Sequence, residues 1–154
     1  MKILFLARTD NCTTQMAHGW LSLFDDTLTV CTAGVICAGR PDPHAIAVMK
    51  EANVDISRYT CDEVGKYVSQ DWDYVVSVVG DALRGQVPFT GWIGQRLYFD
   101  LPDPSQQSGP AVQLHADYLL ACNEIRDRIF DFYLRELLGK EILGADSCGI
   151  ECDL

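Results

Sequence analysis

The sequence predicts a single α/β domain with three layers, in which a four-stranded parallel sheet has helices on both faces. The length of 154 residues suits one domain. Short apolar runs, clearest over residues 3–7 and 73–80, are typical of strands buried on both faces of a sheet. Helical patterns separate these runs, and this alternation favours right-handed βαβ units with parallel strands.

The N-terminal part predicts a strand followed by a helix. Residues 3–7 are continuously apolar, and the polar residues 8–11 follow them. Thr13 or Thr14 could cap the helix, because a threonine hydroxyl can accept a hydrogen bond from the first turn. The expected apolar face of this helix consists of Met16, Trp20, Leu23 and Phe24.

The next segments predict a second strand and two further helices. Residues 28–32 suit a strand that ends just before Gly34. A helix is expected to open at the Pro-Asp-Pro sequence of residues 41–43 and to stop near Asn53. Residues 62–69 suit a short helix.

The C-terminal half predicts two strands and a long helix. Residues 73–80 give the strongest strand signal because they are rich in valine, and residues 96–99 give a weaker one. Prolines exclude regular structure in the loop that follows. Apolar residues then keep a spacing of three to four over residues 112–138. We therefore expect a domain over residues 1–138 and a C-terminal tail over residues 139–154.

Composition and charge restrict the function classes. The chain has 12 Lys and Arg against 22 Asp and Glu, a net charge of −10. A compact body of this charge repels phosphate backbones and anionic membranes, so we expect neither a nucleic-acid nor a membrane partner. The seven cysteines are scattered, with no C-x-x-C pair. This pattern favours free thiols in a reducing cytoplasm and predicts neither a metal nor a cofactor.

The segment after the first strand is the candidate site. In an open parallel sheet, ligands bind at the carboxyl ends of the strands. This segment also leads into a helix N-terminus, where backbone N–H groups and the helix dipole favour an anion. We interpret it as a loop for a small oxyanion or a phosphorylated ligand. It consists of Ala7, Arg8, Thr9, Asp10, Asn11, Cys12, Thr13 and Thr14.

Five stretches carry a resemblance to a known family. They are residues 15–20, 32–34, 43–57, 73–82 and 101–104, which read QMAHGW, TAG, PHAIAVMKEANVDIS, DYVVSVVGDA and LPDP. In these stretches the chain resembles the bacterial-type low-molecular-weight tyrosine phosphatases. It resembles more closely the thioredoxin-coupled arsenate reductases that share their fold. The resemblance covers residues 1–135 and implies the strand order 2-1-3-4.

The chain departs from the family at the reactive residues. The resemblance implies a C-x5-R loop whose cysteine thiolate is the nucleophile and whose arginine clamps the oxyanion. These two positions hold Ala7 and Thr13 here. A glycine of the loop falls at Thr9, and an asparagine falls at Asp10, which places a carboxylate where an anion should sit.

Other family positions are partly kept. The two cysteines that relay a disulfide to thioredoxin fall at Val79 and near Gln86, so both are absent. The second loop cysteine is kept as Cys12, at a helix N-terminus that can lower a thiol pKa. The general acid is kept as Asp103, followed by a proline.

Three functions remain open. The preferred one is a family member without the usual catalysis, a pseudoenzyme that binds or regulates. The second is an active phosphatase or arsenate reductase with Cys12 as nucleophile and Asp103 as acid. The third is a thiol redox sensor in which Cys12 pairs with Cys148 or Cys152. The sequence does not identify a partner protein.

Overall fold

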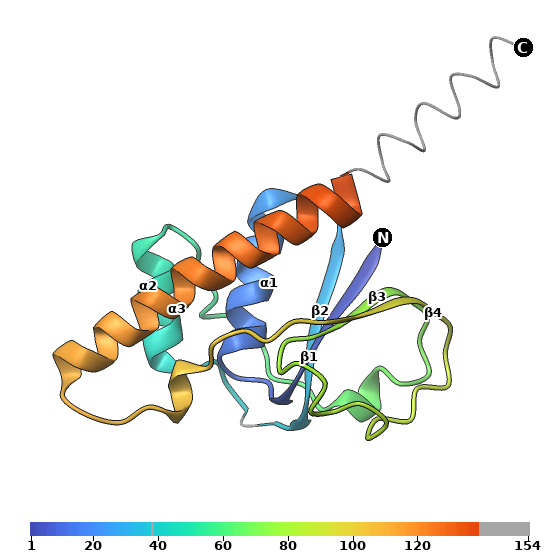
Figure 1. The fold of residues 1–154 in the computed structure, drawn as a ribbon, viewed down its shortest axis with the longest axis horizontal. Coiled ribbons are helices and arrows are strands. Elements are labelled where there is room, and N and C mark those ends of the chain that lie inside the picture. The colour runs from blue at the N-terminus through green and yellow to red at the C-terminus, as the bar shows by residue number, and fades with distance from the viewer. Residues whose placement is uncertain (38, 139–154) are drawn as a thin grey trace, which may run out of the picture.

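A fully parallel sheet with the strand order β2-β1-β3-β4 forms the centre of the computed structural model, which describes residues 1–37 and 39–138 (Figure 1). The central strand β1 pairs with β2 on one side and with β3 on the other. The predicted sheet and its strand order are confirmed. The strands are β1 (Lys2–Thr9), β2 (Thr29–Ile36), β3 (Trp72–Ser77) and β4 (Ile93–Tyr98).

Three α-helices cover one face of the sheet (Figure 1). They pack on side chains that alternate along the central strands, such as Phe5 of β1 and Val76 of β3, both 0% exposed. A hydrophobic core of this kind supplies most of the driving force for folding. The helices are α1 (Thr13–Phe24), α2 (Pro43–Glu51) and α3 (Ala111–Phe132), and η3 (Tyr133–Leu138) continues α3 as a π-helix.

The second face has no α-helix in the described part of the chain, although helices were expected on both faces. A single 3-10 turn, η1 (Val64–Lys66), stands where residues 62–69 were expected to be helical. Residues 78–92 cover the rest of this face irregularly, with Leu83 and Phe89 packed over the sheet. Gly80 and Gly85 there have φ values of 62° and 75°, which a helix does not accommodate.

The ends of several elements differ from the predictions. Strand β2 continues through Gly34 to Ile36, because Ala7 pairs with Gly34 and Thr9 pairs with Ile36. Pairing therefore lengthens both strands beyond their apolar runs. Strand β3 ends at Ser77, and β4 begins earlier than expected. In α2, the Asp42 side chain caps the helix by accepting a hydrogen bond from the backbone of His44.

Other predictions concern the membrane and the tail. No helix in the described ranges has the length and apolarity that crossing a membrane requires. The predicted tail over residues 139–154, with Cys148 and Cys152, lies outside the described residues.

Gly34 allows close contact between β2 and the end of β1. A Cβ atom at this position would lie 2.6 Å from the Ile36 carbonyl oxygen and 2.7 Å from the Asp10 backbone nitrogen. We expect Gly34→Ala to lower the free energy of unfolding by about 2 kcal/mol, because the backbone must shift. Urea denaturation measures the change.

The matched control is Gly65→Ala in η1, where an added Cβ atom meets nothing within 4 Å. It should change the free energy of unfolding by less than about 0.5 kcal/mol. Equal effects of the two substitutions would contradict the close contact at Gly34.

Candidate functional site at the carboxyl end of β1

A cavity of about 250 Å³ opens at the carboxyl end of β1. Three residues at the end of β1, the first residue of α1 and the segments after β3 and β4 surround it. The structure therefore brings Asp103, the predicted general acid, together with half of the predicted anion loop. The lining residues are Ala7, Arg8, Thr9, Thr13, Val79, Asp103 and Gln106.

The loop that the structure shows after β1 is shorter than the eight residues predicted. Its first three residues belong to β1 and its last two to α1, so only residues 10–12 lie outside regular structure. The backbone N–H of Asp10 lies 3.4 Å from the Ile36 carbonyl oxygen and donates to it. This N–H is therefore used by the sheet instead of pointing at an anion.

None of the residues that line the cavity carries a thiol. Ala7 is only 4% exposed and presents a methyl group at the end of β1. Val79 adds a second apolar side chain, and Arg8 and Asp103 supply one positive and one negative charge. The cavity therefore has the location expected of an anion site without a net positive charge.

Thr13 connects α1 to the loop that carries Asp103. Its hydroxyl donates to the Pro102 carbonyl oxygen at 2.8 Å, so it does not cap the helix. The carboxylate of Asp103 accepts hydrogen bonds from the backbone N–H and the hydroxyl of Ser105. These contacts order the 3-10 turn η2 (Pro104–Gln106) and hold Asp103 at the edge of the cavity.

Cys12 stands at the N-cap position of α1, but its surroundings disfavour a thiolate. The side chain is 1% exposed, and burial raises the pKa of its thiol far above the ordinary value. The negative charges of Asp103 and Asp42 raise this pKa further. The lowering that a helix N-terminus was expected to produce is therefore outweighed by burial and by the two carboxylates.

The carboxylate of Asp10 faces the interior instead of the anion cavity, which corrects the expectation from the sequence. The residue is 0% exposed. The hydroxyls of Thr14 and Thr32 donate to the carboxylate at 2.5 and 3.0 Å. The side-chain amide of Gln15 donates at 3.1 Å and the backbone N–H of Asp62 at 3.0 Å. This network joins the turn after β1 to α1, β2 and the segment before η1.

Sequence reasoning missed this network, although it had a signal for part of it. Gln15 and Thr32 both lie in the stretches that carry the family resemblance, and Thr14 lies just before the first of them. The network explains why Thr14 does not cap α1, since its hydroxyl is bound to Asp10. Within the described ranges, no group of three or more His, Cys, Asp or Glu could hold a metal ion.

Comparison with known proteins identifies several relatives, although no family model matches the sequence. The arsenate reductase of Bacillus subtilis is 31% identical over 131 residues, which cover 84% of this chain and 93% of the relative. That of Staphylococcus xylosus is 35% identical over 134 residues, covering 86% and 96%. The glutaredoxin arsenate reductase of Synechocystis is 31% identical over 109 residues, covering 70% and 81%.

Solved structures with a similar fold include an arsenate reductase as well. An arsenate reductase in the phosphate binding state superposes with a TM-score of 0.70 and 25% identity, covering 87% of this chain and 97% of its own. A low-molecular-weight protein tyrosine phosphatase from T. tengcongensis gives a TM-score of 0.68 at 19% identity, covering 89% and 99%. The second likeness concerns the fold alone.

Asp10 should make the stability of the protein depend on pH. Burial raises its pKa to about 6, although hydrogen bonds from Thr14, the Asp62 backbone and Thr32 act in the opposite direction. Because the folded pKa exceeds the ordinary value of 3.8, Asp10 favours the folded state less as pH rises from about 4 to 6. In Asp10→Asn this dependence should disappear.

The measurement is the free energy of unfolding of Asp10→Asn minus that of the unmodified protein. This difference should increase by about 2 kcal/mol between pH 4 and pH 7, which is most of the effect of a shift of two pKa units, because the unfolded carboxyl is already partly ionised at pH 4. Taking the difference cancels the contributions of other titrating groups to the pH dependence. One such group is His18, because burial lowers its pKa to about 4. The control Asp26→Asn removes a carboxyl from an exposed site, where burial does not oppose its charge. A flat difference for Asp10→Asn would contradict the burial of its charge.

Proposed function

Because the chain belongs to the family of arsenate reductases, whose fold it shares with a low-molecular-weight protein tyrosine phosphatase, we propose that it has lost the family's thiol chemistry and acts by binding or regulation. The observation that carries this proposal is the cavity at the end of β1, which has Ala7 and no thiol among its lining residues. A methyl group cannot attack phosphorus or arsenic, so the covalent step has no nucleophile there.

The loss extends beyond the nucleophile. Thr13 replaces the guanidinium fork of an arginine with one hydroxyl, and that hydroxyl is bound to Pro102. The resemblance places the relay cysteines at Val79 and near Gln86, and residues 78–92 contain no cysteine that could carry a disulfide. When reactive groups act as a unit, removal of one of them abolishes nearly all of the catalytic rate. Several simultaneous losses therefore support a silent relative.

Cys12 and Asp103 do not support the alternative of an active enzyme. A cysteine nucleophile must be a thiolate, and the buried Cys12 thiol has a raised pKa. Asp103 already accepts two hydrogen bonds from Ser105, which gives its carboxylate a structural role in η2. The burial of Cys12 also disfavours a redox sensor, because an oxidant reaches a thiol that is 1% exposed only with difficulty.

The ligand that we propose for the cavity is a small oxyanion or a phosphorylated molecule. One arsenate reductase of this fold has been solved in a phosphate binding state, and Vibrio vulnificus Wzb has been solved with benzylphosphonate. Arg8 supplies a positive charge at the same edge of the sheet, and Asp103 reduces its effect. We therefore propose weak anion binding without turnover, in a cytoplasmic protein.

The proposal predicts the absence of turnover. The purified protein should not reduce arsenate with thioredoxin or glutaredoxin as reductant. It should not hydrolyse p-nitrophenyl phosphate above the rate measured without protein. The reason is the missing thiolate, and the arsenate reductase of Bacillus subtilis is the positive control for arsenate reduction.

Two variants show whether any residual rate belongs to Cys12. Cys12→Ser removes the thiol beside the cavity, and Cys122→Ser removes a thiol that is equally buried in α3. Neither substitution should change the rates. Turnover that disappears in Cys12→Ser and persists in Cys122→Ser would show that the chain is an active enzyme.

A further inference from the structure

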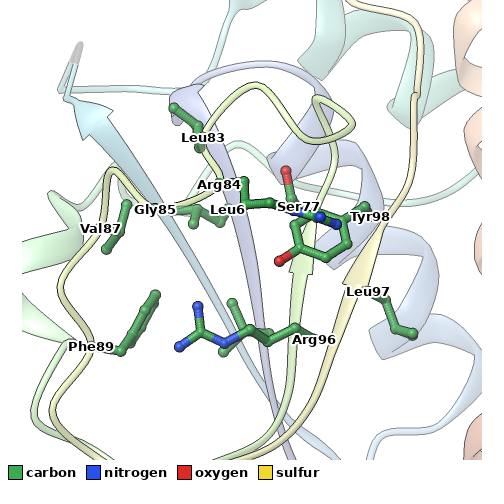
Figure 2. Close-up of a pocket in the computed structure, with 11 residues that line it drawn as sticks. Leu6, Ser77, Leu83, Arg84, Gly85, Val87, Phe89, Arg96, Leu97 and Tyr98 are labelled. Atoms are coloured by element: carbon green, nitrogen blue, oxygen red, sulfur yellow. The ribbon is translucent and has the colours of Figure 1, made fainter.

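A second pocket lies on the face of the sheet opposite the α-helices, between strands β3 and β4 and the segment of residues 78–92 (Figure 2). It shares no lining residue with the cavity at the end of β1. Branched aliphatic side chains form much of its lining, among them Leu6, Val75, Leu83 and Val87. Two exposed arginines, Arg84 and Arg96, belong to the same pocket.

Both arginines are oriented by aromatic rings instead of by carboxylates. The guanidinium of Arg84 lies 4.4 Å from the centre of the Tyr98 ring, and that of Arg96 lies 5.5 Å from the centre of the Phe89 ring. Within residues 1–37 and 39–138, neither forms an ion pair, although the chain has 22 Asp and Glu. Stacking leaves the N–H groups at the edge of a guanidinium available to an oxyanion.

The two guanidinium groups lie at different places around the pocket. Figure 2 shows that of Arg84 beside the Tyr98 ring, whereas the side chain of Arg96 extends toward Phe89. The cavity has a volume of about 30 Å³, which is room for one or two water molecules. A ligand with an aliphatic chain would therefore lie across the lining residues at the mouth of the pocket instead of filling the cavity. A complementary ligand has an aliphatic middle and a negative charge at each end.

We propose that this pocket binds a short aliphatic dicarboxylate, with one carboxylate on Arg84 and the other on Arg96. The methylene groups would cover the aliphatic lining, and each planar guanidinium would donate to one carboxylate. This site goes beyond the proposed function and does not depend on the state of the cavity at β1. Residues 78–92, which lack the relay cysteines of the family, instead contribute Arg84 and Phe89 to the pocket.

The test is a titration of the full ¹⁵N-labelled chain with hexanedioate, followed by NMR. We expect saturable shifts of the amide signals of residues 83–87, 89 and 96–98, since Pro88 has no backbone N–H. Arg84→Gln and Arg96→Gln should each raise the dissociation constant about three- to tenfold, because each removes one charge-assisted contact. Thermal melting of both variants verifies that they fold.

Arg128→Gln is the matched control, since Arg128 also stacks on a ring, 5.3 Å from the centre of Phe99, but does not line this pocket. It should leave the dissociation constant unchanged. Two further probes separate the parts of the ligand. 1,6-Hexanediol has the same chain without charges, and inorganic phosphate has charge without a chain. Neither should shift the signals of residues 83–89 at the concentrations that saturate hexanedioate binding.

Three results would overturn the proposal. One is the absence of shifts at these residues up to the solubility limit of hexanedioate. Another is equal binding by the unmodified protein and by both arginine variants. The third is an equal response to 1,6-hexanediol. Shifts by phosphate at residues 7–14 would concern the cavity at β1 and would leave this site unaffected.

Discussion

The buried carboxylate of Asp10 fixes the carboxyl end of β1, and the geometry of the candidate site depends on it. Asp10 accepts hydrogen bonds from residues of α1, from Thr32 on β2 and from the backbone of Asp62. Burying this charge has a cost, since its pKa rises to about 6. The same contacts direct the carboxylate inward, away from the cavity. Gly34 lets the backbone of Asp10 approach β2, so the turn between β1 and α1 has little freedom to change shape.

This fixed turn is compatible with the proposed loss of the family's reactive groups. Folding depends on the inward-facing residues, namely Asp10 with its donors and the core under α1. Under the proposed function, the family's chemistry would depend on a few residues that face the cavity, at the positions of Ala7, Thr13 and Val79. Replacement of the second set would then leave the first set undisturbed. On the second face of the sheet, some side chains of residues 78–92 pack on the core, whereas Arg84 of the same segment lines a pocket.

The sequence predicted the parallel sheet because its strands are short apolar runs separated by helical patterns. The family motifs also placed Ala7, Thr13 and Asp103 together, as the cavity does. That the Asp10 carboxylate points into the interior was not predictable from local sequence. Two of the groups that donate hydrogen bonds to it lie 22 and 52 residues away along the chain. The thiol of Cys12 is a similar case. A helix N-terminus is a local feature, whereas the burial and the carboxylates that outweigh it come from the tertiary structure.

Alkylation of the folded protein by iodoacetamide at pH 7 tests the central claim most directly, namely that no reactive thiolate lies at the carboxyl end of β1. Peptide mass spectrometry gives the modified fraction of each cysteine. Cys37 is less deeply buried than Cys12 and reports that the reagent is active. The structure predicts that Cys12 stays unmodified in the folded protein and reacts only after unfolding in urea. Modification of Cys12 ahead of Cys37 in the folded protein would contradict the account.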